Sequence, residues 1–288
     1  MGRETKSNGQ KDIFDRFYTT PETVQKCLTL LDFSRYDCII EPSAGTGNFT
    51  RQFPTDKRVF SYDLNPEADG IIEADWFKVD KSQFNQYKSI LVCGNPPFGQ
   101  QNTLAVNFFN EAAKFCDTIA FILPLSFKKD SVQNRLNLNF HLKDEIVLID
   151  CDFLLKDEEK IKVPCVFQVW EREKNPRKPV RLKTVTDLFA FVDKSEADFR
   201  IQRVGGNAGK ASFDLTKSPS SNYFIKNKTE MSNEELVEHI NQLKFPTIEF
   251  TVGPKSLSKG ELIAVLEESL ELQKSFLIFI KKYYIIYM

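Results

Sequence analysis

The sequence predicts an α/β fold with a parallel central sheet, followed by a small α+β region. Short apolar, β-branched runs alternate with segments of helical apolar spacing up to about residue 171, which is the βαβ pattern of parallel sheets. The apolar runs are continuous, as strands covered on both faces require. With 288 residues, 41% hydrophobic and 27% charged, the chain can bury a large core without disulfides.

The strands of the predicted sheet are seven apolar runs, namely Cys38–Glu41, Val59–Asp63, Gly70–Glu73, Ser89–Cys93, Thr118–Pro124, Glu145–Asp150 and Val163–Trp170. Three other segments have apolar residues at helical spacing, and we expect helices at Thr20–Leu31, Ala44–Gln52 and Thr103–Phe115.

Past residue 183 the pattern changes to short strands and one amphipathic helix. Phe199–Gly209 and Phe224–Lys228 are predicted as strands joined by glycine turns. Asn233–Leu243 is predicted as a helix, because Ser232 and Glu235 form a capping box at its start.

Neither end of the chain predicts a membrane segment. Residues 1–15 are polar and lack the apolar core of a signal peptide. The apolar tail Ser275–Met288 is shorter than the about 20 residues of a membrane span, and Lys281 and Lys282 interrupt it. We expect a docked terminal helix or strand there. The six cysteines lack metal-binding spacing, which favours free thiols in an intracellular protein, cytoplasmic or in the nucleoid or nucleus.

Positive charge gathers in residues 172–228, which hold 13 Lys and Arg against 6 Asp and Glu. The densest part comprises Arg172, Lys174, Arg177, Lys178, Arg181 and Lys183. Such an excess suits a surface for a polyanion, whose phosphates bind Lys and Arg with release of counterions. A solvated basic linker, helped by Pro176 and Pro179, explains the same composition.

A glycine loop follows the first predicted strand, in Glu41-Pro-Ser-Ala-Gly-Thr-Gly-Asn-Phe49. Gly45 and Gly47 permit backbone conformations and a close ligand approach that a Cβ would block. The loop lacks the third glycine of a dinucleotide fingerprint and the Gly-Lys-Ser/Thr of a phosphate loop.

Acidic residues end the next two predicted strands. Asp63 lies 18 residues beyond Gly45, where a carboxylate can bind both hydroxyls of a ribose. Asp75 follows the third strand, and Trp76 or Phe77 beside it could cover an adenine ring. A single Asp at a strand end is often only a turn or cap residue.

The fourth predicted strand ends in Asn95-Pro-Pro-Phe98. Two prolines fix φ and prevent the strand from continuing, so a rigid loop is the simplest explanation. The loop nevertheless falls at the sheet edge where α/β proteins bind ligands, together with Gly45, Asp63 and Asp75.

In their order along the chain, the run Phe17–Pro21, the glycine loop, Asp63, Asp75 and Asn95–Phe98 resemble the class I S-adenosylmethionine-dependent methyltransferases. The resemblance is to amino-methyltransferases of the adenine-N6 DNA type, and it covers about residues 14–171. It implies a Rossmann-like seven-stranded sheet with helices on both faces, and S-adenosyl-L-methionine as the cofactor. It also implies that Phe121–Phe127 flanks the target base and that Val163–Trp170 is a closing antiparallel strand.

The resemblance implies a role for each matching residue. Thr20, Pro21 and Glu41 would contact the methionine part of the cofactor, and Gly45 and Gly47 would shape the loop beneath it. Asp63 would bind the ribose and Asp75 the adenine. Trp76, next to Asp75 in the sequence, is also expected to bind the cofactor, because its ring could cover the adenine. Asn95, Pro96, Pro97 and Phe98 would be the catalytic tetrapeptide.

Two alternatives for the function stay open. Similar tetrapeptides occur in RNA methyltransferases for adenine N6 or guanine N2 and in protein glutamine methyltransferases, and a non-catalytic nucleic-acid-binding module would keep the same fold. DNA is favoured over RNA as the partner, and no metal site is expected, because His141 and His239 lack nearby ligands at metal spacing. We expect an N-terminal segment 1–13, a methyltransferase domain 14–171, a basic extension 172–228 and a C-terminal segment 229–288.

Overall fold

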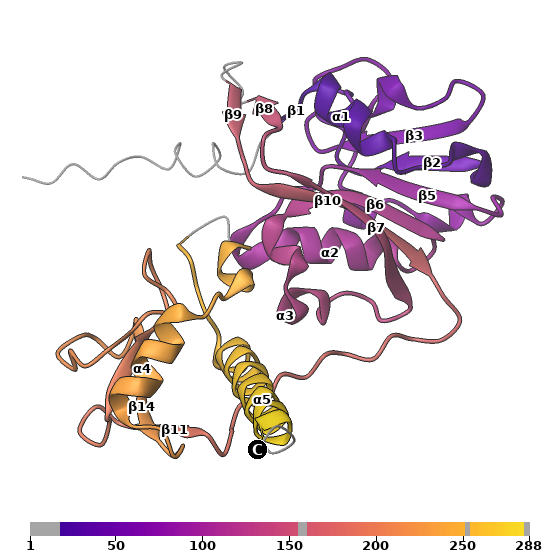
Figure 1. Ribbon diagram of the computed structural model, residues 1–288. Helices are drawn as coiled ribbons and strands as arrows, with labels where there is room; N and C mark the ends of the chain where they lie inside the picture. Colours follow the sequence, from indigo (N-terminus) through magenta and orange to yellow (C-terminus); the bar gives the residue numbers. More distant parts are fainter. Residues whose placement is uncertain (1–17, 155–159, 251–253, 285–288) are drawn as a thin grey trace, which may run out of the picture. The chain divides into compact units, whose positions relative to one another are not determined.

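The computed structural model describes residues 18–154, 160–250 and 254–284, and the chain divides into two compact units at Pro179 and Val180 (Figure 1). The expected segment 1–13, Phe17 and the last four residues of the apolar tail lie outside the described residues. The division falls within the basic extension expected at 172–228.

A seven-stranded sheet forms the centre of the first unit. Its strands, in spatial order, are β4 (Ile72–Glu73), β3 (Arg58–Asp63), β2 (Cys38–Glu41), β5 (Ile90–Gly94), β6 (Thr118–Pro124), β10 (Cys165–Arg172) and β7 (Phe140–Leu148). The first five are parallel, whereas β10 pairs antiparallel with both β6 and β7. The predicted Rossmann-like α/β architecture is therefore confirmed.

The direction of winding reverses between β2 and β5. The chain proceeds from β2 outward to β3 and β4, and then returns to build β5 and β6 on the other side of β2. All residues of β2, β5 and β6 are buried, which explains why these strands are apolar apart from Glu41 at the end of β2 and Thr118 at the start of β6. Ligands of open α/β sheets bind at such a reversal, beyond the carboxyl ends of the strands.

Helices cover both faces of this sheet. Helix α1 (Pro21–Leu28) buries Val24 and Cys27 in one core, together with inward side chains of β2, β5, β6 and β10. Helix α2 (Thr103–Ala112) packs on the opposite face, where Phe109 makes edge-to-face contacts with the rings of Phe140 and Trp170 at centroid distances of 5.7 and 5.6 Å. A short helix α3 (Asp130–Gln133) follows β6.

The helix predicted at Ala44–Gln52 is wrong. This segment is a loop that ends in one 3₁₀ turn, η3 (Thr50–Gln52). Gly45 and Gly47 have φ values of +49° and +77°, which a right-handed helix cannot contain. Further 3₁₀ turns in this unit are η2 (Phe33–Arg35), η4 (Trp76–Lys78), η5 (Lys81–Phe84), η6 (Gln100–Asn102) and η7 (Leu125–Lys128).

A small second sheet, which the sequence did not predict, lies in the first unit. Its strands are β1 (Tyr18–Thr19), β8 (Asp152–Leu154) and β9 (Lys160–Lys162). Because Tyr18 pairs with Leu154 and Thr19 with Phe153, the start of the described chain is held beside a segment more than 130 residues later.

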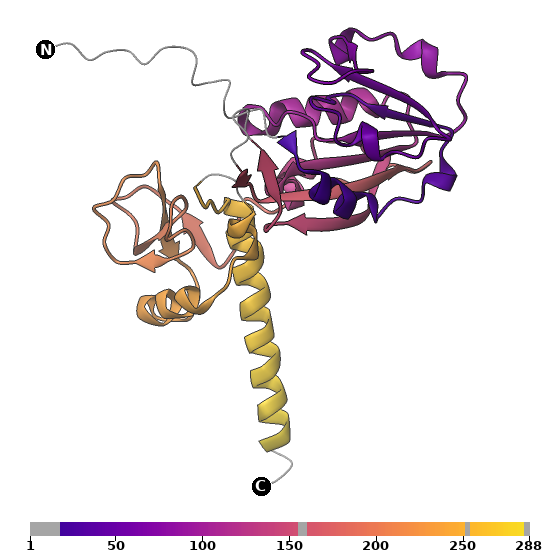
Figure 2. The same cartoon turned by 90° about the horizontal axis from the view of Figure 1, so that it is seen from above.

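The second unit is α+β, as predicted. Its antiparallel sheet has the order β11 (Phe189–Phe191), β14 (Asn222–Asn227), β12 (Phe199–Gln202) and β13 (Ala211–Ser212). The helices are α4 (Asn233–Gln242), η8 (Pro246–Glu249) and the long α5 (Lys259–Tyr284), which is continuous in Figure 2. The capping box of Ser232 and Glu235 is present at the start of α4.

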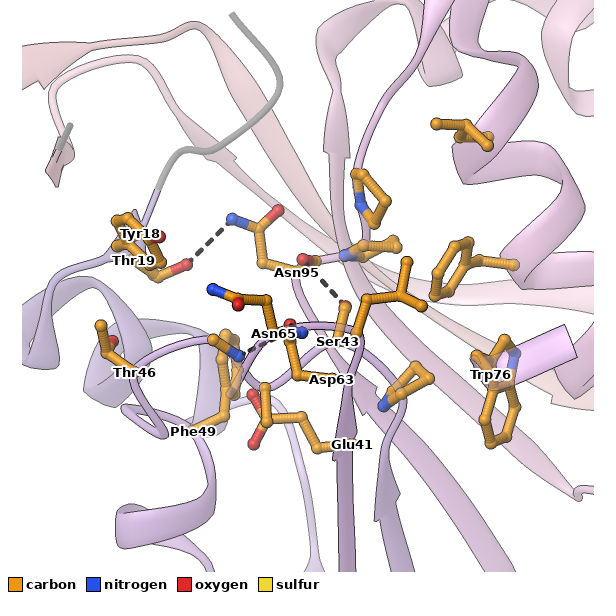
Figure 3. Close-up of a pocket in the computed structure, with 18 of the residues that line it drawn as sticks. Tyr18, Thr19, Glu41, Ser43, Thr46, Phe49, Asp63, Asn65, Trp76 and Asn95 are labelled. Atoms are coloured by element: carbon orange, nitrogen blue, oxygen red, sulfur yellow. Dashed lines mark hydrogen bonds between the residues drawn. The ribbon is translucent and has the colours of Figure 1, made fainter. Parts of the chain in front are cut away.

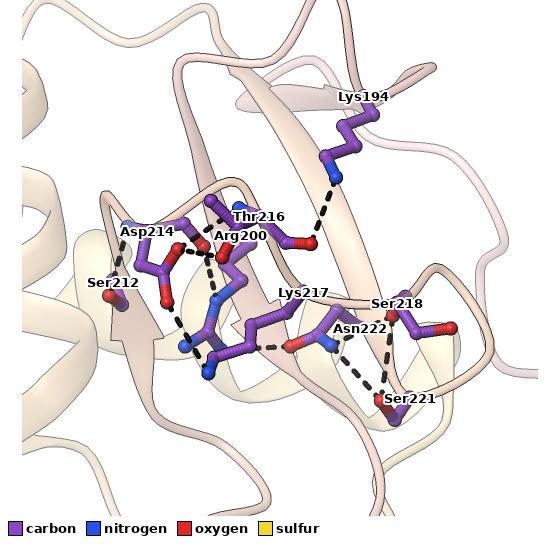
Figure 4. Close-up of polar contacts among 9 residues, drawn as sticks. All are labelled: Lys194, Arg200, Ser212, Asp214, Thr216, Lys217, Ser218, Ser221 and Asn222. Atoms are coloured by element: carbon purple, nitrogen blue, oxygen red, sulfur yellow. Dashed lines mark hydrogen bonds and ion pairs between the residues drawn. The ribbon is translucent and has the colours of Figure 1, made fainter.

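A buried arginine organises the loop between β13 and β14. Arg200 is 9% exposed, and its Nε and Nη1 donate to the Asp214 carbonyl at 2.7 Å and to Asn222 Oδ1 at 2.8 Å (Figure 4). Lys217 pairs with the Asp214 carboxylate at 3.6 Å, and Lys194 donates to the Thr216 carbonyl at 3.0 Å. Several positive charges of the basic region therefore hold this loop in place.

Among the described helices, none combines the length and the apolar composition that crossing a lipid bilayer requires.

Candidate functional site

A cavity of about 330 Å³ lies in the first unit at the carboxyl ends of β2, β3 and β5 (Figure 3). Its lining comes from the glycine loop, from the segments after β3 and β4, from the tetrapeptide after β5, from β1 and from α2. Of the predicted site residues, the lining includes Glu41, Gly45, Asp63, Asp75, Trp76, Asn95, Pro96, Pro97 and Phe98. Residues distant in sequence thus meet at the reversal point of the sheet.

The glycine loop is fixed by Asp63. Gly45 N donates to Asp63 Oδ2 at 2.8 Å, and Asn65 N donates to Oδ1 at 2.8 Å. The Tyr18 ring covers the loop so closely that a Cβ on Gly45 would lie 3.1 Å from it. Each carboxylate oxygen can accept further bonds, so Asp63 combines a loop contact with a position on the cavity.

Glu41 is a buried carboxyl group, 2% exposed, on the wall of the cavity. Its Oε2 accepts from Thr50 N at 2.9 Å and from Thr50 Oγ1. Burial raises the pKa of Glu41 to about 8, against the opposing effect of the Thr50 donors. A cation bound in the cavity would favour the ionised form of this group.

Asp75 and the two aromatic residues after it differ in their exposure. Asp75 Oδ1 caps η4 by accepting from Phe77 N at 3.0 Å. Trp76 is 2% exposed and packs with its ring near Tyr62 and Phe115, at centroid distances of 6.1 Å. Phe77 is 42% exposed and also lines the cavity. Phe77, rather than Trp76, therefore has the ring area available to a flat ligand.

Asn95 is oriented by the neighbouring small sheet. Its Nδ2 donates to Thr19 Oγ1 at 3.1 Å, and its backbone carbonyl accepts from Ser43 Oγ at 3.1 Å. The first bond turns the Nδ2 end of the amide toward β1 (Figure 3). The carbonyl end is then the acceptor that the side chain can present to a bound group.

Thr20, Pro21 and Gly47 are not among the residues that line the cavity. The Thr20 hydroxyl instead caps α1 by accepting from Thr23 N at 3.3 Å. Their neighbours Tyr18 and Thr19 line the cavity in their place. Within the run Phe17–Pro21, the sequence predicts cofactor contacts for Thr20 and Pro21. The structure instead places Tyr18 and Thr19 at the cavity, on strand β1, which pairs with β8.

Three of the six residues in the densest part of the basic region form hydrogen bonds or ion pairs within their own unit. Arg172 donates to the carbonyls of Cys116 and Ala113 at 2.9 and 2.6 Å, which caps the end of α2. Arg177 donates to the Phe140 and Leu136 carbonyls at 3.0 and 3.1 Å. In the second unit, Lys183 forms an ion pair of 2.6 Å with a glutamate of α5. Lys174, Lys178 and Arg181 are exposed.

The histidines and acidic residues do not assemble a metal centre within the described parts of the chain. His141 Nε2 contacts the Asn175 carbonyl at 2.9 Å, and His239 contacts Ser269 at 2.9 Å.

No family model and no curated protein matches the sequence. Solved structures with a similar arrangement include a candidate RNA methyltransferase from Pyrococcus horikoshii, at 12% identity and a TM-score of 0.42, over 55% of this chain and 87% of that one. The 23S rRNA methyltransferase ErmE is 16% identical, with a TM-score of 0.39, over 56% and 71% of the two chains. A modification subunit of a candidate type I restriction enzyme from Vibrio vulnificus is 16% identical, with a TM-score of 0.38, over 57% and 46%. At these values the likeness assigns no activity to this chain.

Proposed function

We propose that this chain is an S-adenosylmethionine-dependent methyltransferase that acts on an exocyclic amine of nucleic acid, with adenine N6 of DNA as the leading substrate. The observation that supports the proposal most is the position of Asn95–Phe98. This tetrapeptide opens onto the same cavity as the glycine loop and the acidic ends of β3 and β4.

The cavity fits the cofactor in size and chemistry. Its volume of about 330 Å³ lies within the range of small-molecule sites. Asp63 offers carboxylate oxygens for ribose hydroxyls, the exposed Phe77 ring suits an adenine, and Glu41 offers a carboxyl group to a cationic ligand. Bound S-adenosylmethionine would supply a methyl group activated by its positive sulfur.

Asn95 and Pro96 can prepare the accepting nitrogen. The lone pair of an exocyclic amine is delocalised into the base, so the nitrogen must become pyramidal before it attacks a methyl group. The Asn95 amide, held at its Nδ2 by Thr19, presents Oδ1 to one amine hydrogen, and the Pro96 carbonyl can accept the other. Acceptors placed beforehand stabilise the positive charge that develops on nitrogen.

Phe98 can stack on the target base once that base has flipped out of the nucleic-acid duplex. Its ring is partly buried, packs against the hydrophobic core of the first unit and lines the cavity. Extrusion of a paired base costs a few kcal/mol, and stacking on an aromatic ring returns about 1–3 kcal/mol. The proton of the methylated amine can leave after transfer, so Asn95 need not act as a charged base.

Cofactor binding is the first test. Isothermal titration of the full chain with S-adenosylmethionine should show binding, and Asp63→Ala should weaken it by at least tenfold, because charge-assisted hydrogen bonds are lost. Asp80→Ala is the matched control, since Asp80 caps η5 and does not line the cavity. A folded wild-type chain that binds no cofactor would contradict the proposal.

The acceptor is identified separately. Incubation with labelled cofactor and DNA, RNA or cell protein, followed by digestion to nucleosides or peptides, should yield N6-methyladenine from DNA. Label in RNA or in glutamine would move the substrate to one of the alternatives. Cofactor binding without any transfer would favour the non-catalytic nucleic-acid-binding module.

A further inference from the structure

The turn that follows the tetrapeptide is conformationally unusual. Gly99, Gln101 and Asn102 have φ values of +68°, +51° and +63°. Within the described ranges, Gln101 and Asn102 are the non-glycine residues with positive φ. Residues with a Cβ are uncommon in this region, asparagine and aspartate less so than the others, and residues held in strained conformations gather at functional sites.

Side chains from other elements hold this turn in place. Asn102 Nδ2 donates to Ser126 Oγ at 2.8 Å, from η7, and Arg135 Nη1 donates to the Gln101 carbonyl at 2.8 Å, from the segment after α3. Within the turn, Asn102 N donates to the Gly99 carbonyl at 3.3 Å. Tertiary contacts therefore compensate for an unfavourable backbone.

The turn determines where Phe98 lies. The tetrapeptide is fixed at one end by β5, and the rings of Pro96 and Pro97 fix φ in its middle. At its other end, the Phe98 carbonyl accepts from Ala105 N at 3.3 Å, which ties it to the first turn of α2. The path from Phe98 into α2 passes through these residues, so we expect a change in the turn to shift Phe98.

The contact between Asn102 and Ser126 also joins two neighbouring loops. Strands β5 and β6 are parallel and adjacent, with Leu91 opposite Thr118, so the loops that follow them leave the same edge of the sheet. The loop after β5 carries the tetrapeptide, and η7 follows β6. The loop after β5 lines the cavity, whereas η7 does not line it and supports that loop from the neighbouring strand through Ser126.

We propose that Asn102 and Ser126 are a positioning pair, which locks the left-handed turn and thereby holds Phe98 in place for the target base. This inference rests on the proposed function. Neither residue touches the reacting atoms in this account, since both act through the backbone of Phe98. A plain connection between a strand and a helix would not need left-handed residues at two non-glycine positions.

The test compares Ser126→Ala, Asn102→Ala and the double variant with wild type. We expect the Ala105 amide to exchange its hydrogen about tenfold faster in each, because the turn loosens. The methyl-transfer rate at saturating cofactor should fall at least tenfold, since a displacement of about 1 Å can cost up to 100-fold. The KM for S-adenosylmethionine should stay within about twofold. The double variant should be no slower than the slower single variant, because both remove one interaction.

Two further variants separate positioning from general stability. Asn102→Asp should restore exchange and rate to within about threefold of wild type, because aspartate tolerates a positive φ and can accept from the Ser126 hydroxyl. Ser82→Ala is the matched control on the 3₁₀ turn η5, which does not line the cavity. Midpoints of thermal unfolding, measured on the same samples, check that each variant is folded.

Unchanged exchange and rate in Ser126→Ala would overturn the inference. Equal losses in Asn102→Asp and Asn102→Ala would also overturn it, because the hydrogen bond would then be irrelevant. If the wild type transfers no methyl group to any polymer, the proposed function fails, while the exchange of Ala105 still decides whether the pair holds the turn.

Discussion

The buried carboxyl group of Glu41 predicts how the stability of the first unit depends on pH. Burial raises its pKa from 4.5 to about 8. Between these values the folded chain keeps a proton that the unfolded chain releases, so the free energy of unfolding falls as pH rises. The two pKa values differ by about 3.5, and each pH unit is worth about 1.4 kcal/mol. The free energy of unfolding can therefore fall by at most about 5 kcal/mol as this group titrates.

Glu41→Gln removes the titration and keeps an acceptor. The amide oxygen can still accept from Thr50, which donates from both its backbone and its hydroxyl. The stability of the variant relative to wild type should therefore increase by several kcal/mol between pH 5 and pH 8. The neutral side chain should also lower the affinity for a cationic ligand.

Urea unfolding at several pH values measures this difference. Trp76 and Trp170 are the two tryptophans of the chain, and both belong to the first unit, so tryptophan fluorescence follows that unit alone. Glu73→Gln is the matched control, because Glu73 is exposed on β4. Parallel stability curves for wild type and Glu41→Gln from pH 5 to pH 8 would refute the reasoning.

Three further predictions concern the second unit and the basic residues. Ser232→Ala should lower the stability of α4 by about 1 kcal/mol through loss of its cap, as measured by hydrogen exchange of its amides. Gly209→Ala should lower the stability of the second unit by about 1–3 kcal/mol, because φ is +89° and the new Cβ would lie 2.6 Å from the Phe245 ring. Hydrogen exchange of the amides of this unit measures the loss, and exchange equal to wild type would contradict the prediction. Replacing the exposed Lys174 and Lys178 by Gln should flatten the dependence of log affinity for nucleic acid on log salt by up to about 2, whereas an unchanged slope would favour the solvated linker.

Continuous burial is what made the central strands predictable. The bounds of β6 match the predicted range to the residue, because all seven of its side chains are buried and apolar patterning is unambiguous. Strand β7 begins at Phe140, five residues before the predicted start, because this edge strand mixes exposed and half-buried positions. The apolar spacing of Ala44–Gln52 predicts a helix, whereas the positive φ values of Gly45 and Gly47 exclude one.

The candidate site was predictable where residues follow strands. Strand ends on a parallel sheet share one edge, which brought Glu41, Asp63, Asp75 and Asn95 together from sequence alone. The contribution of β1 was not predictable, because Tyr18 reaches the cavity through pairing with a strand far along the chain. Likewise, sequence cannot distinguish a basic side chain that binds phosphate from one that caps a helix.

The aromatic residues beside Asp75 also differ in ways that the sequence does not reveal. The sequence offers Trp76 or Phe77 to cover an adenine ring. The structure buries Trp76 among other aromatic rings, although Trp76 also lines the cavity. Its neighbour Phe77 remains exposed at the cavity. The two rings of one 3₁₀ turn lie in different environments, and the sequence does not reveal which one is exposed at the cavity.

The methyl-transfer rate of Asn95→Ala tests the central claim most directly. Wild type and variant are incubated with labelled S-adenosylmethionine and DNA, cofactor affinity is measured on the same samples, and the products are digested to nucleosides. Removal of one preorganised acceptor should lower the rate by about 100-fold or more while cofactor affinity stays within about twofold. We expect N6-methyladenine from wild type and almost none from Asn95→Ala, and equal label from both proteins would contradict the role proposed for Asn95.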